Sequence, residues 1–239
     1  MKMVNSKKFY ERVSGKIHLE HGGSVNIVFL GDSVTHGCFA SGYGIVGHDR
    51  FASYTMKFHK MISVLFPNTV FNIINSGIGG GTATTGLERL DRDVISYHPD
   101  LVVVSFGLND HGDLAGNLAS LGKIFDKLNE LEIPCVYLSE NMMNTEVAED
   151  IEKTCPQFVE YAKQTPILQN GGTMDNLFES YMALAKSKGV TVCDVYGKWK
   201  KLQECGANIT MLLANRINHP IREMHDFTAF SLINTLFFE

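Results

Sequence analysis

Val25-Asn26-Ile27-Val28-Phe29-Leu30-Gly31-Asp32-Ser33-Val34-Thr35 is the stretch that decides the fold of this chain. Its first six residues form an almost continuous apolar run, which is typical of a strand buried on both faces of a parallel sheet. The run ends at Gly31-Asp32-Ser33, so a serine hydroxyl follows the carboxyl end of that strand. Gly, Asp and Ser are also common in ordinary turns. The stretch therefore predicts a buried strand and leaves Ser33 open between a nucleophile and a turn residue.

Four further short apolar runs follow, and each has the length of a buried strand. They occupy residues 70–74, 101–106, 133–138 and 190–195. Apolar residues recur at helical spacing in the segments 51–65, 114–131, 177–184 and 224–237. Strands that alternate with helices form a parallel sheet with right-handed crossovers. The pattern predicts an α/β protein, a three-layer α/β/α sandwich around a five-stranded parallel sheet.

The length of 239 residues fits one large α/β domain, so residues 1–239 are expected to form a single unit. One segment, at about residues 140–172, is long for a connection in a compact domain. Its apolar side chains could cover a ligand site, and it could also be a helical decoration on the edge of the sheet. The sequence leaves these two compatible interpretations open.

The composition is that of a globular protein. Hydrophobic residues make up 44% of the chain and charged residues 20%, which is enough apolar material for a substantial core. The formal net charge is −5 and no long Lys/Arg cluster occurs, so neither nucleic acid nor an anionic membrane surface is expected as a partner. No apolar run reaches the length of about 18 residues that a membrane-spanning helix needs. The expected partner is a small-molecule substrate, and a homo-oligomer stays open.

The amino terminus and the cysteines bear on location. The first eight residues lead into mixed polar sequence without an apolar core and a small-residue cleavage site, so no signal peptide is expected. The five cysteines are odd in number and have no CxxC spacing, which is typical of reduced thiols. These features predict a cytoplasmic protein.

Polar or glycine-rich segments follow several of the predicted strands. Ser33 follows the first strand, and the segment Asn75-Ser76-Gly77-Ile78-Gly79-Gly80-Gly81-Thr82 follows the second. Asn109 follows the third strand, and His219 lies beyond the last. In such sheets ligands bind outside the carboxyl ends of the strands. A hydroxyl, backbone amides, a carboxamide and an imidazole are therefore expected at one edge of the sheet.

These groups suit acyl transfer to water, which needs a nucleophile, a base and donors for the developing oxyanion. Ser33 would attack the carbonyl carbon. His219 would accept the serine proton and pass it to the leaving alcohol, since the pKa of histidine lies near neutrality. The backbone amides of Ser33 and Gly80 and the side-chain amide of Asn109 would hold the oxyanion.

The four segments together resemble the blocks of the SGNH, or GDSL, hydrolases. The matching residues are Gly31-Asp32-Ser33, Gly80, Asn109 and His219-Pro220, in the order and at the strand ends that the family uses. The resemblance implies a flavodoxin-like fold and ester hydrolysis through an acyl-enzyme on Ser33, with no metal or other cofactor. It also implies the absence of the G-x-S-x-G elbow of the α/β-hydrolases, and Ser33 lacks that pattern.

One position departs from the family. An Asp usually stands three residues before the catalytic histidine and orients its imidazole, but this chain has Arg216 there. Loss of the acid from a serine-protease triad lowers turnover about 10⁴-fold, so another acceptor is expected to hold the imidazole N–H. A backbone carbonyl or Asn215 is the favoured candidate, and Asp226 is a less favoured one.

Four residues beside these blocks are candidates for the pocket. Asp32 and Asp110 are expected to brace loops, and His36 and His111 lie a few residues beyond block residues and could line the pocket. Cys38 shares the loop of Ser33, and nothing in the sequence marks it as a nucleophile.

Two other kinds of site are not expected. The glycines of residues 77–81 satisfy no phosphate-binding motif, because Thr82 stands where the dinucleotide fingerprint needs Gly and no Gly-Lys-Ser/Thr follows. Eight of the nine histidines lack paired metal-ligand spacing, and the ninth is His219, so no metal site is predicted.

The sequence therefore predicts a serine ester hydrolase that cleaves short acyl esters, with acetyl groups on carbohydrate as the favoured class. Two alternatives stay open. The fold could have lost its hydrolytic power and act as a binding module, a hypothesis that Arg216 motivates. The enzyme could also act on longer acyl chains as a lysophospholipase or thioesterase, because fold alone does not select the substrate.

Overall fold

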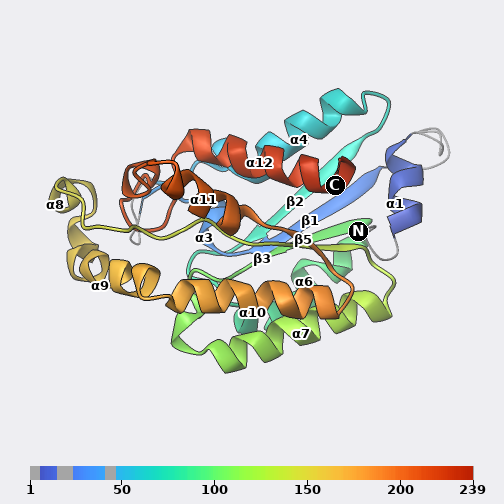
Figure 1. Ribbon diagram of the computed structural model, residues 1–239. Helices are drawn as coiled ribbons and strands as arrows, with labels where there is room; N and C mark the ends of the chain where they lie inside the picture. The colour runs from blue at the N-terminus through green and yellow to red at the C-terminus, as the bar shows by residue number, and fades with distance from the viewer. Residues whose placement is uncertain (1–5, 15–23, 41–46, 239) are drawn as a thin grey trace.

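The computed structural model describes residues 6–14, 24–40 and 47–238 (Figure 1). A single sheet contains β1 (Val25–Gly31), β2 (Phe71–Gly77), β3 (Leu101–Ser105), β4 (Cys135–Leu138) and β5 (Thr191–Cys193). All neighbouring strands are parallel, in the order β2-β1-β3-β4-β5. The predicted fold class is confirmed, and each of the five apolar runs overlaps one of the strands.

The strand ends differ from the prediction by a few residues. β2 continues beyond its apolar run to Gly77, because Asn75 and Ser76 pair with Phe29 and Leu30 of β1. β4 begins at Cys135, after Pro134, which has no amide hydrogen to donate to a neighbouring strand. β5 is limited to three residues, since the amide of Val190 still bonds the carbonyl of Ala185 in the preceding helix.

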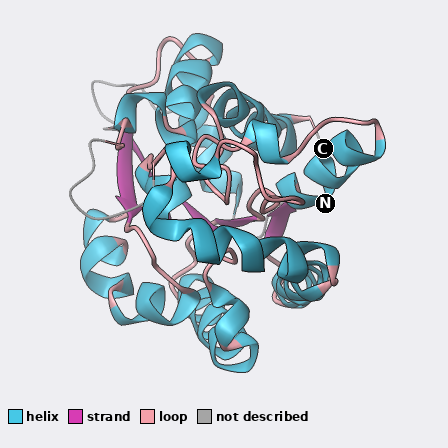
Figure 2. Cartoon of the chain, turned by 90° about the vertical axis from the view of Figure 1, so that its left-hand side faces the viewer, coloured by secondary structure: helices cyan, strands magenta, loops and turns pink. Residues whose placement is uncertain are grey.

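Helices cover both faces of the sheet (Figures 1 and 2). Above it in Figure 1 lie α4 (Tyr54–Leu65) and α12 (Arg222–Phe237), and below it lie α7 (Leu114–Glu130) and α10 (Thr173–Ser187). The remaining helices are α1 (Ser6–Val13), α3 (Ser33–His36), α5 (Ala83–Glu88), α6 (Leu90–Asp93), α8 (Ile151–Thr154), α9 (Val159–Asn170) and α11 (Val195–Glu204). Among the described residues no helix is long and apolar enough to cross a membrane.

The segment expected to be helical from residue 51 begins later. Asp49 caps a short 3₁₀ turn, Arg50–Ala52, through its side chain, and α4 starts only after Ser53. Phe51 therefore lies outside the helix and is 85% exposed, whereas Tyr54 and Phe58 pack in the core. Two competing cap residues in succession explain the shift, because both Asp and Ser favour helix starts.

The ends of β1 and β3 lie side by side at the point where the order of strand addition in the sheet reverses. β1 is the second strand of the sheet, with β2 on one side and β3 on the other. In the flavodoxin-like order this switch point lies between β1 and β3, and ligands bind outside the strand ends there. Ser33 follows β1 directly, and Asn109 lies four residues beyond β3.

Residues 140–172 form a loop followed by α8 and α9. The loop packs against the segment that carries His219: the amide of Asn144 donates to the carbonyl of Ile217 at 2.8 Å, and Asn141 Nδ2 donates to the carbonyl of Asn218 at 2.9 Å. A small apolar cluster of Ile151, Cys155, Ala162 and Ile217 joins the same two parts of the chain. Residues 140–172 therefore pack against the segment that carries His219 and stabilise it.

Candidate active site

Ser33 is the first residue of α3, a one-turn helix that begins directly after β1. Asp32 caps this helix, and its Oδ1 accepts the amide of Val34 at 2.9 Å. A side chain at Gly31 would meet Thr35 and the carbonyl oxygen of Ser105, so the direct passage from strand to helix requires glycine. The strand and its cap thus fix Ser33, which is 6% exposed, at the carboxyl edge of the sheet.

Ser33 and His219 form a hydrogen-bonded pair, with His219 Nε2 3.0 Å from Ser33 Oγ. The other ring nitrogen, Nδ1, lies 3.1 Å from the carbonyl oxygen of Ala40. A carbonyl only accepts, so Nδ1 carries the proton and donates it to Ala40. The lone pair of Nε2 then faces the serine hydroxyl, and this is the tautomer that a general base needs.

The environment of His219 makes its imidazole a weak base. Burial lowers the pKa of His219 from its ordinary value to about 4, and the bond to the Ala40 carbonyl opposes this effect only in part. A charged imidazolium is unfavourable where it is desolvated. The uncharged form of His219 is therefore dominant at neutral pH.

Of the two side chains predicted to orient His219, Asn215 acts on the backbone of the loop. Its Oδ1 accepts the backbone amides of Ile217, Asn218 and His219 at 2.9–3.0 Å. Arg216, in the family's acid position, has a left-handed φ of 61° and donates to Asp150 and to the carbonyl of Leu213. The imidazole N–H is thus held by a backbone carbonyl, which is one of the predicted alternatives.

Asp226, the less favoured candidate, is engaged elsewhere. Its Oδ2 lies 2.7 Å from Lys57 Nζ on α4, and its side chain is half exposed. We expect Asp226→Asn to change kcat and kcat/KM by less than about twofold, since exposed ion pairs contribute little. Steady-state kinetics beside Lys57→Gln, which breaks the same ion pair, checks this. A loss of two orders of magnitude in a folded Asp226→Asn variant would assign it the orienting role.

The proposed oxyanion donors lie around Ser33. Gly80 has a left-handed φ of 75°, and apart from its two chain neighbours no described residue has an atom within 4 Å of the place a side chain would take. Asn109 Nδ2 donates to Asp32 Oδ2 at 2.8 Å and to the carbonyl of Gly81 at 3.0 Å. Asn109 therefore joins the loops after β1, β2 and β3. Both hydrogens of its amide already have acceptors, so it must exchange or share one of them to bind an oxyanion.

Three buried carboxyl groups lie behind these donors: Asp32, Asp110 and Glu140. Asp110 accepts the hydroxyl of Tyr181 at 2.8 Å, and Glu140 Oε2 accepts the amide of Leu108 at 2.8 Å. The buried carboxyls of Asp32 and Glu140 interact, and Glu140 Oε1 has no hydrogen-bond donor among the described residues, so a proton on one of the two acids relieves their repulsion. Burial raises the pKa of both Asp32 and Asp110 to about 6 and holds the pKa of Glu140 well above its usual range. Glu140 is thus the protonated partner of Asp32.

The sequence reasoning did not single out Glu140. Its signal was position, because it stands two residues after Leu138, the end of β4, at the same sheet edge as the other site residues. A carboxyl at such a strand end, followed by the apolar Met142 and Met143, could have been recognised as buried.

We expect Glu140→Gln to flatten the dependence of stability on pH. The folded pKa of Glu140 is raised, so its stabilising contribution is complete below the unfolded value of about 4.3 and is lost as pH rises toward the folded pKa. The effect is at most about 1.4 kcal/mol per pH unit. Glutamine reproduces the protonated acid without titrating, so the Tm of the variant relative to wild type should rise between pH 4.5 and 8. Glu130→Gln, at an exposed site, is the control, and parallel curves for Glu140→Gln would contradict the assignment.

The two histidines expected near the pocket have different surroundings. His36 Nε2 lies 3.1 Å from Arg50 Nη2, and its ring packs against that of His48. His111 Nδ1 lies 3.2 Å from the carbonyl of Leu108 in the turn after Asn109. Neither residue belongs to the pocket described next.

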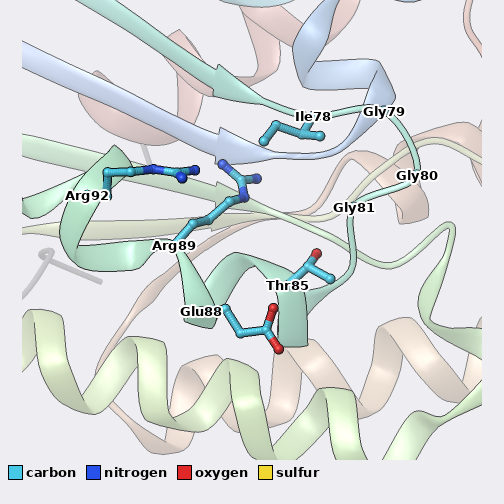
Figure 3. Close-up of a pocket in the computed structure, with 8 residues that line it drawn as sticks. All are labelled: Ile78, Gly79, Gly80, Gly81, Thr85, Glu88, Arg89 and Arg92. Atoms are coloured by element: carbon cyan, nitrogen blue, oxygen red, sulfur yellow. The ribbon is translucent and has the colours of Figure 1, made fainter.

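A polar pocket of about 370 Å³ opens beside Gly80 (Figure 3). Its walls are residues 78–81 from the loop after β2 and residues from α5 to α6, with Ile78 the only large apolar side chain among them. Arg89 forms one side, and it donates to the carbonyls of Gly31 and Ser76 at the ends of β1 and β2. The pocket thus adjoins a proposed oxyanion donor, and its lining combines glycine backbone with charged side chains.

Comparison with known proteins gives a consistent family match. The model of the GDSL-like Lipase/Acylhydrolase family matches residues 29–227, which contain all four blocks. No curated protein sequence matches the chain significantly.

Several solved structures share the fold. A two-domain esterase active on acetylated mannans has a TM-score of 0.69 at 18% identity; the match covers 98% of this chain and 52% of the esterase, so the chain spans about half of that protein. The acetylxylan esterase Axe2 of Geobacillus stearothermophilus has a TM-score of 0.68 at 19% identity, with 91% and 96% covered. A lipase/acylhydrolase of Enterococcus faecalis has a TM-score of 0.65 at 19% identity, with 88% and 94% covered.

Proposed function

The chain belongs to the GDSL-like lipase/acylhydrolase family, and from this premise we propose that it hydrolyses short acyl esters, with O-acetyl groups on carbohydrate as its substrate class. The observation that carries the proposal is the pair of Ser33 Oγ and His219 Nε2 at 3.0 Å, in the tautomer of a general base. This pair lies at the sheet edge where such folds bind ligands.

The proposed reaction has two halves. Ser33 Oγ attacks the ester carbonyl carbon while its proton passes to His219 Nε2, and the resulting oxyanion is held by the amides of Ser33 and Gly80 and by Asn109. As the tetrahedral intermediate collapses, the imidazolium gives its proton to the leaving alcohol, and the acyl group stays on Ser33. A water molecule then attacks the acyl-enzyme, again with His219 as base, and releases the carboxylic acid.

The preference for a short acyl group rests on the pocket beside Gly80. Its walls carry the charged side chains of Glu88, Arg89 and Arg92, and Ile78 is the one large apolar side chain that lines it, so a long acyl chain would find no continuous apolar wall there. Two of the structural relatives, at 18–19% identity, act on acetylated mannan and acetylated xylan. Both observations support an acetylated sugar.

Rates on p-nitrophenyl acetate, butyrate and octanoate, together with acetate release from acetylated xylo- and manno-oligosaccharides, test the substrate class. We expect kcat/KM on the acetate to exceed that on the octanoate at least tenfold. A preference for octanoate would instead support lysophospholipase or thioesterase action on longer chains.

An impaired hydrolase that binds esters is the second candidate. It is favoured by the low basicity of His219 and by the engaged amide of Asn109. Fluorophosphonate labelling with peptide mapping distinguishes the two, because only an activated serine reacts rapidly. A folded protein whose Ser33 stays unmodified at high reagent excess would favour the binding module.

The acid limb of kcat/KM is expected at about pH 4. Burial lowers the pKa of His219 to about 4, so its Nε2 stays free to accept the serine proton until the pH falls to that value. Initial rates in short assays from pH 3.5 to 8, with Tm measured in each buffer to exclude unfolding, check this. A limb near pH 6.5, the ordinary histidine value, would contradict the assigned environment.

A further inference from the structure

Three potential metal ligands meet beside the active site, although their spacing in the sequence predicted no metal site. One ligand atom each from His36, Cys38 and His48 lies within 4.8 Å of the other two. His36 ends α3, Cys38 follows two residues later, and His48 comes ten residues after Cys38. The long separation between Cys38 and His48 explains why sequence spacing did not reveal the cluster.

Backbone contacts hold these ligands together. Cys38 and His48 form an antiparallel bridge, and a backbone hydrogen bond lies on each side of it. The amide of Asp49 donates to the carbonyl of Gly37 at 2.9 Å, and the amide of Phe39 donates to the carbonyl of Gly47 at 2.7 Å. Gly37 has a left-handed φ of 92°, and a side chain there would crowd the carbonyl of Asp49. Backbone contacts between residues 37–39 and residues 47–49 therefore hold the three ligands together.

The polar atoms of the cluster are incompletely satisfied. His36 Nδ1 is buried and has no hydrogen-bond partner among the described residues, while Nε2 faces Arg50. The rings of His36 and His48 lie 4.9 Å apart, and Cys38 is 4% exposed. Buried ring nitrogens usually have a hydrogen-bond partner. An unpaired nitrogen beside a thiol and a second imidazole therefore points to a ligand that these groups bind together.

We propose that His36, Cys38 and His48 form a binding site for a borderline-soft divalent cation, of which Zn²⁺ fits best. One thiolate and two imidazoles are ligands that Zn²⁺ prefers, and a water molecule would complete the tetrahedron. Zinc–ligand bonds of 2.0–2.3 Å place tetrahedral ligands about 3.4 Å apart. The side chains thus need to close by about an ångström, a movement within the reach of small rotamer changes.

Charge and proton balance are consistent with this site. Burial and the nearby Asp32 raise the pKa of the Cys38 thiol to about 11, so the cation displaces the thiol proton to solvent as the sulfur–metal bond forms. The negative charge of Asp32 that disfavours a lone thiolate favours a cation. Arg50 opposes binding because its guanidinium lies against His36, but Arg50 is exposed and can swing into solvent.

A metal ion at this site would act on the backbone segment that carries Ala40, whose carbonyl orients His219. The amide of Cys38 donates to the carbonyl of Ser33 at 2.9 Å, and Ala40, whose carbonyl accepts the imidazole N–H, lies two residues beyond Cys38. A metal ion at the cluster would link His36 and Cys38 to His48 without contacting Ser33 Oγ or the imidazole of His219. The proposal rests on the cluster alone and stands whether or not the chain hydrolyses acetyl esters.

Metal titration of the full chain, after treatment with a chelator, tests the site. With Zn²⁺ and a chromophoric competitor we expect one equivalent bound with Kd at or below about 1 μM. Co²⁺ should give a thiolate-to-metal charge-transfer band that Cys38→Ser removes. Cys38→Ser and His48→Gln should each weaken Zn²⁺ binding at least about 100-fold, Arg50→Gln should strengthen it, and Cys205→Ser, at an exposed thiol, should leave it unchanged.

Three outcomes would overturn the proposal. The first is a wild-type protein that binds no Zn²⁺ below about 100 μM. The second is tight binding that survives both ligand substitutions, which would place the ion elsewhere. The third is a Co²⁺ spectrum without a thiolate band. Circular dichroism of each variant separates loss of the site from loss of the fold.

Discussion

Replacement of Ser33 by alanine is expected to lower kcat on p-nitrophenyl acetate on the order of 10⁴-fold or more, with Tm within about 2 °C of wild type. Removal of the nucleophile of a serine hydrolase has an effect of this size because the acyl-enzyme cannot form. Ser33 Oγ bonds His219, and alanine keeps the strand-to-helix turn that Gly31 and Asp32 build. Stopped and continuous assays beside thermal unfolding measure both quantities.

The double variant Ser33→Ala/His219→Ala sharpens this test. Two residues that act as one unit lose activity together, so the double variant should be no slower than either single variant. Ser180→Ala, which removes an exposed hydroxyl bonded within α10, is the matched control and should leave kcat unchanged. Turnover that persists in Ser33→Ala would exclude Ser33 as the nucleophile.

Replacement of Asn109 by alanine is expected to lower kcat by about 10²–10³ while KM changes little, because an oxyanion donor acts mainly in the transition state. It should also destabilise the fold by about 1–3 kcal/mol, because Asp32 Oδ2 loses a buried donor. Kinetics and denaturant unfolding separate the two effects.

Asn129→Ala is the control for Asn109→Ala. Asn129 Nδ2 also donates to a carbonyl, that of Lys188, at a distance from the site. The control should lose some stability and keep full kcat. A rise in KM with kcat unchanged in Asn109→Ala would show that Asn109 binds substrate in the ground state and does not serve as an oxyanion donor.

The sequence predicted the sheet and the place of the candidate site because both depend on side-chain pattern. The apolar run of β1 and the polar residues after the strands can be recognised in the sequence itself, and parallel strands bring their carboxyl ends to one edge of the sheet. The same reasoning placed Ser33 and His219 near each other, and the structure puts them at 3.0 Å.

What the sequence did not predict depends on backbone or on burial. A backbone carbonyl was among the predicted acceptors for the His219 N–H, but the sequence could not identify Ala40 as its source, because every residue type carries such a group. Glu140 pairs with Asp32 only because β4 ends beside β3. The cluster of His36, Cys38 and His48 arises from a backbone bridge between Cys38 and His48 that their spacing in the sequence does not reveal. Contacts of this kind appear only when the chain is folded.

The use of a main-chain carbonyl at Ala40 has a consequence for how this protein can change over generations. A triad acid is lost by one codon change, whereas the group that holds His219 is retained under any substitution at position 40 that leaves the chain path intact. The constrained neighbour is Gly47, because a side chain there would collide with Ala40. Heritable variation that affects the imidazole is therefore expected to arise from insertions and deletions between Cys38 and His48, because a change in chain length there would shift the Ala40 carbonyl.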